Sequence, residues 1–200
     1  MPIEISLTDF IEFVIRSGTP KLTLVKQIKN RPSYHPNLDY WKILRDSLEE
    51  FHKENKEKKE LDKILQLITN KTKEDNYAEL INTYKVFLGR KQIKWFEPPY
   101  KTWKNNDLLI RLNPELGLSI KGHKYVVKLY FKSESISKSR IDLILTLLKN
   151  ELKSKGSDFD VALLDIRSKK LYTDDKIDAS LLMPLLIGEA NSFETIWKKI

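Results

Sequence analysis

The chain has 200 residues, of which 40% are hydrophobic and 32% charged, and its formal net charge is +8. This balance is typical of a folded protein of one domain, or of one domain with a helical extension, and it argues against a disordered chain. The chain contains no cysteine, which excludes a disulfide framework, a thiolate nucleophile and a cysteine-based zinc site.

Residues 1–89 are predicted to be helical. Ser6, with Asp9 three residues later, is typical of a helix start. Apolar residues at helical spacing predict further helices near residues 23–29, 40–54, 61–68 and 77–88, the last ending at Gly89. The segment RPSYHPNLD, with Pro32 and Pro36, is predicted to be a rigid connector.

The apolar period changes from helical to alternating near residue 90. LLIRL, LGLSIKG and KYVVKLYFK predict three consecutive antiparallel strands over residues 108–132, the last two joined by a turn at Gly122 and His123. A helix starting near Ser139, a buried strand DFDVALLDI and a helical region from Asp178, with a break at Gly188, are expected to follow. The predicted fold is therefore α+β, with a helical N-terminal half (1–89) and an α/β core (90–200), which either form separate regions or one compact unit.

Positive charge is concentrated between residues 90 and 132, where ten basic residues stand against three acidic ones, a local excess of seven out of the chain's eight. The basic residues are Arg90, Lys91, Lys94, Lys101, Lys104, Arg111, Lys121, Lys124, Lys128 and Lys132. Aromatic residues are interleaved with them, which is typical of nucleic-acid-binding proteins.

Lys124, Lys128 and Lys132 are predicted to share one face of a strand, because side chains alternate with a period of two. One hypothesis is a phosphate-binding ridge, with Tyr130 available to stack on a base and with Arg111 and Lys121 nearby. The alternative is a solvated outer face, where lysine is common.

The predicted order of helix, three antiparallel strands, helix and strand over residues 77–172 resembles the core of the restriction-endonuclease-like, or PD-(D/E)xK, nucleases. In that family a carboxylate near the second strand and an acid-x-Lys on the third bind a divalent metal and orient the attacking water. The resemblance implies that Pro114 and Glu115 match the first half of the motif and that Lys128 is the lysine. Val126 stands where the second acid is expected.

Some members of that family carry the missing acid on the following helix, where this chain offers Asp142, with Glu134 in the preceding loop. If the protein is a nuclease, the resemblance implies Glu115, Lys128 and Asp142 as its catalytic residues and Mg²⁺ or Mn²⁺ as its cofactor. The combination NPELGL, KLYFK and LLDIRSKKL also resembles a set of uncharacterised bacterial proteins with no assigned activity.

Other sites have little support in the sequence. His35, His52 and His123 lack the spacing of zinc ligands, and the acids near residues 158–160 and 174–178 fit helix and strand ends. No phosphate loop or dinucleotide fingerprint is present, so no small-molecule cofactor is predicted.

We also expect a cytoplasmic protein that does not enter the membrane. The longest apolar run, residues 179–188, is far shorter than the roughly 20 residues that span a bilayer. The N-terminal segment carries acids where a signal peptide would be basic.

The sequence thus predicts a protein that binds DNA or RNA on a nuclease-like core without a full metal site. The predicted nucleic-acid-binding residues are Arg111, Lys121, Lys124, Lys128, Tyr130 and Lys132. Two alternatives stay open: an active divalent-metal-dependent nuclease, and an interaction module that binds an acidic protein. The sequence does not choose between DNA and RNA, and it leaves the oligomeric state open.

Overall fold

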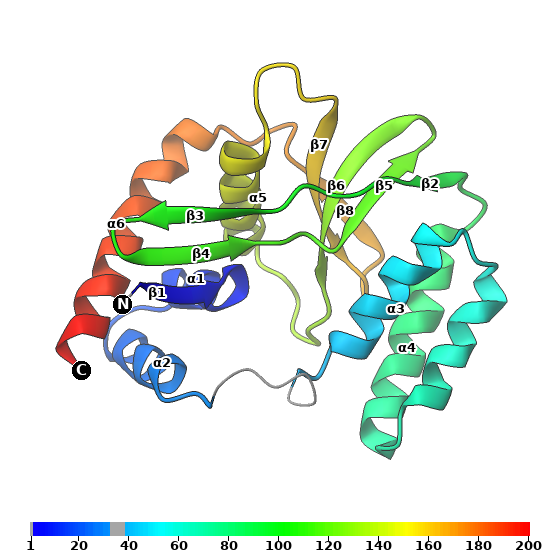
Figure 1. Cartoon of the computed structure of the whole chain (residues 1–200), viewed down its shortest axis with the longest axis horizontal. Coiled ribbons are helices and arrows are strands. Elements are labelled where there is room, and N and C mark those ends of the chain that lie inside the picture. The colour runs from blue at the N-terminus through cyan, green and yellow to red at the C-terminus, as the bar shows by residue number, and fades with distance from the viewer. Residues whose placement is uncertain (1, 33–38) are drawn as a thin grey trace.

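The computed structural model describes residues 2–32 and 39–200, so the connector around His35 and Pro36 lies outside the described residues. The fold is α+β (Figure 1). The strands are β1 (Ile3–Ser6), β2 (Ile93–Trp95), β3 (Lys101–Asn105), β4 (Leu108–Leu112), β5 (Leu116–Ile120), β6 (His123–Tyr130), β7 (Phe159–Asp165) and β8 (Lys170–Thr173). The helices are α1 (Leu7–Val14), α2 (Thr19–Lys29), α3 (Lys42–Lys53), the 3₁₀ helix η2 (Lys58–Leu67), α4 (Lys71–Leu88), α5 (Lys138–Leu152) and α6 (Ala179–Lys199).

A five-stranded sheet in the order β2-β5-β6-β7-β8 forms the centre of the molecule. Strand β5 is antiparallel to both of its neighbours, β2 and β6. Strand β7 is parallel to β6, and β8 is antiparallel to β7. The β5–β6 turn consists of Lys121 and Gly122, whose φ angles are 53° and 86°. Positive φ at both positions is what a two-residue hairpin of type I′ requires. The turn therefore lies one residue before the predicted one, and His123 begins β6.

A second sheet has the order β1-β4-β3 and corrects one prediction. Residues 108–112 form a strand as expected, but β4 pairs with β1 and β3 and not with β5. The antiparallel unit that includes β5 and β6 takes β2 as its third strand, and the β3–β4 hairpin is inserted between β2 and β5. Alternating hydrophobicity indicates that a segment is a strand, but it does not name the neighbouring strand.

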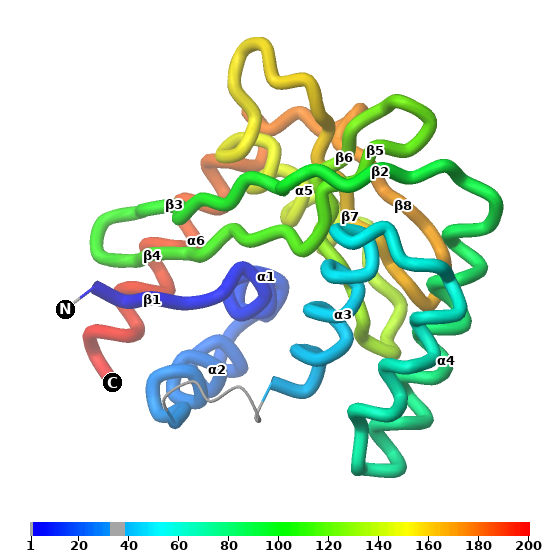
Figure 2. Tube along the Cα trace, turned by 45° about the vertical axis from the view of Figure 1, so that its right-hand side comes forward, coloured from blue at the N-terminus to red at the C-terminus, as the bar shows by residue number. Residues whose placement is uncertain are grey.

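Helices cover both faces of the five-stranded sheet (Figures 1 and 2). On one face α3, η2 and α4 pack on β5, β6 and β7 through one hydrophobic core, which includes Tyr77, Tyr84 and Leu118. On the other face α5 packs with α1, α2, α6 and the three-stranded sheet in a second core, which includes Phe10, Ile110 and Phe193. Both cores combine residues from before and after position 90.

Local sequence signals explain several helix ends. Ser6 accepts the amide of Asp9 at the start of α1, as predicted, and Gly89 ends α4 with a φ of 50°. Helix α5 starts at Lys138, one residue before the predicted Ser139, because Ser137 caps it by accepting the amide of Arg140. The predicted break at Gly188 is wrong, since α6 runs through it as one helix.

Gly117 permits a close approach between two strands. Its carbonyl accepts the amide of Phe96 at 3.0 Å, just after β2. A Cβ placed on Gly117 would lie 2.1 Å from the carbonyl oxygen of Phe96, a contact that backbone atoms cannot tolerate. The glycine in NPELGL is therefore needed where β5 and the end of β2 meet.

Candidate functional site

The lysine row of β6 and the residues after it is present, but each lysine contacts a carboxylate. Lys124 pairs with Asp158 at 2.5 Å, at an exposed position. The other pairs are Lys128 with Glu115 and Lys132 with Glu12. These ion pairs balance the ammonium charges, whereas the hypothesis of a phosphate-binding ridge assumed unpaired lysines.

Glu115 is held by the β5–β6 hairpin on both of its carboxylate oxygens. Oε1 accepts the ammonium of Lys128 at 2.5 Å, and Oε2 accepts the amide of Leu129 at 2.7 Å. The amide of Glu115 donates in turn to the carbonyl of Val127 at 3.0 Å. The side chain thus continues the hydrogen-bond ladder of the hairpin beyond its last backbone pair.

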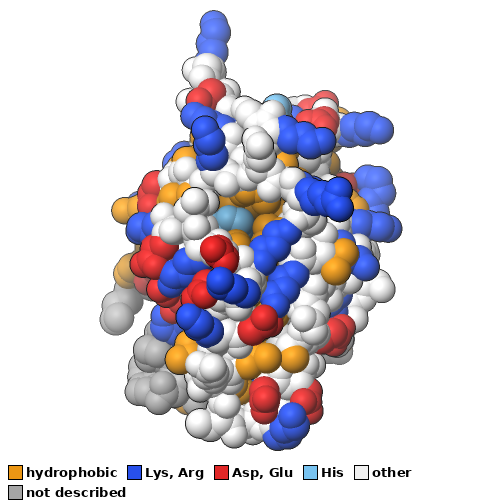
Figure 3. Space-filling view, turned by 90° about the vertical axis from the view of Figure 1, so that its right-hand side faces the viewer, with side chains coloured by type: hydrophobic (Ala, Val, Ile, Leu, Met, Phe, Trp, Pro, Cys, Tyr) orange, Lys and Arg blue, Asp and Glu red, His pale blue; other side chains and the backbone are white. Residues whose placement is uncertain are grey.

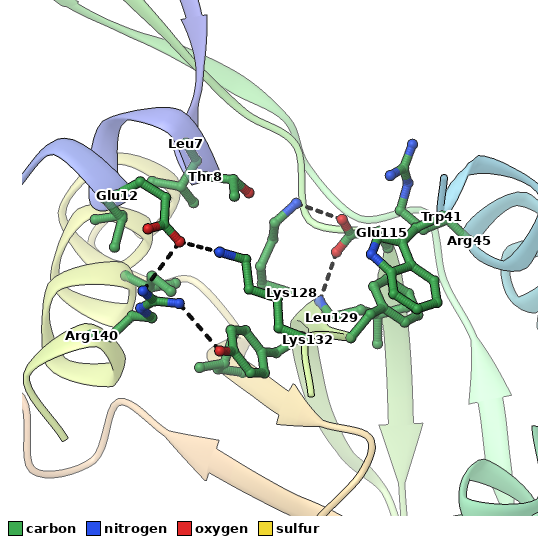
Figure 4. A pocket seen from close by; sticks show the side chains of 15 residues that line it. Leu7, Thr8, Glu12, Trp41, Arg45, Glu115, Lys128, Leu129, Lys132 and Arg140 are labelled. Atoms are coloured by element: carbon green, nitrogen blue, oxygen red, sulfur yellow. Dashed lines mark hydrogen bonds and ion pairs between the residues drawn. The ribbon is translucent and has the colours of Figure 1, made fainter. Parts of the chain in front are cut away.

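A cavity of about 150 Å³ lies beside this pair, between α1, α3, α5 and the end of β6 (Figure 4). Its charged lining residues are Glu12, Arg45, Glu115, Lys128, Lys132 and Arg140. Glu12 comes from α1, and sequence reasoning missed it. A single acid on the polar face of a helix carries no signal that the helix will pack against β6.

Every cation that lines the cavity is paired inside the protein. Arg140 contacts Glu12 at 3.1 Å and Glu134 at 2.8 Å, and Arg45 contacts Asp39 at 2.6 Å. Figure 4 shows Lys132 and Arg140 converging on the carboxylate of Glu12. The charged side chains that line the cavity are therefore balanced in a network of ion pairs, and the network has no excess of positive charge.

Tyr130 also differs from its expected position. Its side chain is only 7% exposed and belongs to the core under α5, while its hydroxyl contacts Glu134 and receives a hydrogen bond from Arg140. The buried ring has no open face on which a base could stack.

The residues required for a divalent-metal clamp do not come together. Asp142 pairs with Lys138 on its own helix, and it does not line the cavity that holds Glu115 and Lys128. Glu115 uses both oxygens in the hairpin, and Val126, which is fully buried, supplies no ligand. Magnesium and manganese need several oxygen ligands, so the residues present do not fit the metal site that the family resemblance implies.

Among residues 2–32 and 39–200, one group of three carboxylates lies close enough to share an ion, namely Asp160, Asp174 and Asp175. Asp160 and Asp174 are both paired with Lys153. Asp160 lies opposite Tyr125 at the start of β6, whereas Lys128 lies further along the strand. The acidic group is thus separate from Glu115 and is already neutralised in part by lysine.

Unbalanced positive charge gathers instead around β2. Of the ten basic residues between positions 90 and 132, the described structure gives no carboxylate partner to Arg90, Lys91, Lys94, Lys104 and Lys121. Four of these lie next to β2, in it, or in the β5–β6 turn beside it. We call Arg90, Lys91, Lys94, Lys121 and the nearby Lys58 the basic edge.

Three members of the basic edge, Lys58, Lys91 and Lys121, lie close enough to affect one another electrostatically. Burial lowers the pKa of the Lys91 ammonium, and the neighbouring charges of Lys121 and Lys58 lower it further. Figure 3 shows the side of the molecule on which α3 and α4 lie, where lysine and arginine side chains, with some carboxylates among them, lie around a hollow. Like charges held together repel, so this region favours an anion.

Of the remaining predicted residues, Arg111 is exposed on β4 and lies 3.9 Å from Glu4 of the neighbouring strand. Lys121 is exposed at the tip of the hairpin. The predicted nucleic-acid-binding residues therefore come from both sheets.

Comparison with protein-family models finds none that matches the chain, and no curated protein matches it significantly. In the part of the chain that the structure describes, no helix combines the length and the apolar character needed to cross a membrane.

Proposed function

We propose that this chain binds nucleic acid through the basic edge, on a nuclease-like core without a full catalytic metal site. The observation that carries the proposal is the segregation of charge. Arg90, Lys91, Lys94 and Lys121 have no carboxylate partner among the described residues and lie at one edge of the five-stranded sheet. The lysines in and just after β6 are paired.

The order of elements supports the nuclease-like part of the proposal. Helix α4 precedes the antiparallel strands β2, β5 and β6, after which α5 crosses over to β7, which is parallel to β6. This order agrees with the helix, three strands, helix and strand of the restriction-endonuclease-like core, once the β3–β4 hairpin is treated as an insertion. The incomplete set of acids around Glu115 supports binding in preference to cleavage.

Binding through unpaired lysines is expected to depend on counterion release and to show little sequence preference. Replacing Lys91, Lys94 and Lys121 together by alanine should flatten the dependence of log K on log salt by about two to three units, because each lost phosphate contact removes roughly 0.7 to 0.9 of a unit. Fluorescence anisotropy with labelled duplex and single-stranded oligonucleotides over a range of salt concentrations measures this slope.

The matched control replaces Lys26, Lys155 and Lys176, which are exposed, lie outside the basic edge and have no carboxylate partner in the described structure. This control loses the same three positive charges as the basic-edge variant, but its salt slope should stay close to that of the parent protein. Equal flattening in both variants would show that total charge, and not the basic edge, determines binding. Absence of binding at about 50 mM salt, where the electrostatic attraction is strong, would overturn the proposal in favour of an acidic protein partner.

A further inference from the structure

A hollow of about 140 Å³ opens beside the basic edge, between the end of α3, the start of η2 and the end of α4. The residues that matter in its lining are His52, Lys58 and Lys91. Lys56 also lines it, but that ammonium is paired with Glu50 and Glu54. The hollow therefore combines two ammonium groups without carboxylate partners in the described structure and one imidazole.

The two free ammonium groups are fixed by the last turn of α4. Lys58 donates to the carbonyl of Gly89, and Lys91 donates to the carbonyl of Phe87. The ammonium of Lys91 also lies 4.5 Å from the centre of the Phe87 ring. Since an ammonium has three donors, each lysine keeps donors for a further acceptor. The helix end holds the charges in place without cancelling them.

His52 supplies a donor of a different kind. Its side chain is 8% exposed, and its Nε2 lies 2.6 Å from the hydroxyl of the fully buried Tyr84. Its Nδ1 has no hydrogen-bond partner among the described residues. When the tyrosine hydroxyl donates to Nε2, the neutral ring carries its proton on Nδ1 and offers it to a ligand. Burial lowers the pKa of His52 to about 4, so the ring is neutral at pH 7.

This donor set defines the chemistry of the ligand. Two fixed ammonium groups and one neutral N–H donor suit a compact dianion with several acceptor oxygens, and a phosphate monoester is such a group. An internal phosphodiester carries a single charge and is flanked by two sugars, whereas a terminal phosphate can enter a small hollow end-on. The adjacent basic edge would then contact the phosphates that follow along the strand.

We propose that the hollow binds the terminal phosphate of a nucleic-acid strand through Lys58, Lys91 and Nδ1–H of His52. This inference rests on the proposed function, to which it adds the strand end as the preferred ligand.

The test compares oligonucleotides of one sequence that carry a 5′-phosphate, a 3′-phosphate or hydroxyl groups at both ends. We expect one phosphorylated end to bind about tenfold more tightly than the hydroxyl form, the change expected from a charge-assisted contact. Lys58→Gln and Lys91→Gln should each reduce this preference. Lys94→Gln, from the same basic edge but outside the hollow lining, should weaken all three oligonucleotides equally.

A second readout follows the imidazole nitrogens of His52 by NMR during titration with inorganic phosphate. We expect the His52 signals to shift in the parent protein and to shift less in Lys91→Gln. Equal binding of all three oligonucleotides would overturn the inference and leave the proposed function standing. Phosphate-dependent shifts without binding of any oligonucleotide would overturn both the proposed function and the strand end as the ligand.

Discussion

Glu115 and Lys128 face each other across the β5–β6 hairpin, 2.5 Å apart, with side chains only 12% and 13% exposed. The same carboxylate accepts the amide of Leu129. Both residues belong to the half-motif that resembles a nuclease site, yet each satisfies the other. Their arrangement indicates a structural role in closing the end of the hairpin.

Glu115→Ala is therefore expected to destabilise the protein by about 3 kcal/mol, because it leaves Lys128 without its partner in a largely buried position. Glu115→Gln should cost less, since the amide oxygen still accepts the N–H of Leu129. Urea unfolding followed by circular dichroism measures both changes. The control is Asp158→Ala, which removes a solvent-exposed partner of Lys124 and should change stability far less, because water screens the exposed ion pair. Equal losses in Glu115→Ala and Asp158→Ala would contradict the structural role.

Magnesium and manganese are expected to support no cleavage of single-stranded or duplex nucleic acid by this protein. The carboxylates that could complete a clamp with Glu115 are engaged elsewhere, since Asp142 pairs with Lys138. The measurement is a gel assay with end-labelled substrates at several metal concentrations. Metal-dependent cleavage that disappears in folded Glu115→Gln would establish the nuclease alternative.

Replacement of Lys124 and Lys132 by alanine should change the salt slope of nucleic-acid binding by less than about one unit, because both ammonium groups already have carboxylate partners. This expectation reverses the one drawn from the sequence alone, where the lysine row was the main binding surface. The comparison uses the same anisotropy titrations as the basic-edge variant. If the salt slope of this double variant flattens by two units, the lysines in and after β6 contact the nucleic acid and the expectation is wrong.

Gly117→Ala is expected to destabilise the protein by about 1–3 kcal/mol or more, because the new methyl group would collide with the carbonyl of Phe96. Gly188→Ala is a matched control in a helix interior, where a Cβ meets nothing within 4 Å. The control should stabilise the protein by about 0.5–1 kcal/mol, since alanine favours a helix more than glycine does. Chemical unfolding of the two variants gives opposite signs if the strand contact is as described.

His52 should make stability depend on pH between about 4 and 6.5. Burial lowers its pKa in the folded protein to about 4, whereas the unfolded chain takes up the proton near 6.5. Its contribution is therefore fully present above pH 6.5 and is lost as pH falls toward 4. The two pKa values imply a loss of roughly 3 kcal/mol across this window.

The free energy of unfolding of the parent protein and of His52→Gln, measured by urea titration from pH 4 to 7, isolates this contribution. Titrating carboxylates affect both proteins, so the difference between the two curves reports on His52. A constant difference across the whole range would show that the imidazole does not change protonation on unfolding.

The sequence predicts the helices well where an apolar face and a cap agree. Helix α4 has the expected buried Tyr77 and Tyr84 and the expected end at Gly89, but it starts at Lys71, before the predicted residue 77. Strand β1 was missed because four residues leading into a helical pattern carry too little periodicity. Strand β8 is similarly short and only partly buried, so its alternation is weak.

The contacts of the candidate site were harder to predict from the sequence than the helices. The pairing of Glu115 with Lys128 follows from the register of the β5–β6 hairpin. A correct prediction of the turn residues would therefore have predicted this pair. The contact of Glu12 with Lys132 depends on how α1 packs on the sheet, and no local pattern encodes that packing. Likewise, lysines in a row predict a charged surface only if their acidic neighbours are known.

The pairing of β1 with β4 also constrains the order in which the chain can fold. Ile3 lies in register with Leu108, so the first strand has no partner during synthesis until much of the chain has emerged from the ribosome. Contacts between such distant segments form slowly, because a long loop must close before they are gained. During that interval β1 is an unpaired strand with Ile3 and Ile5 uncovered, and unpaired strands can pair with other chains. The long separation between β1 and β4 therefore leaves this strand open to aggregation until β4 has been made.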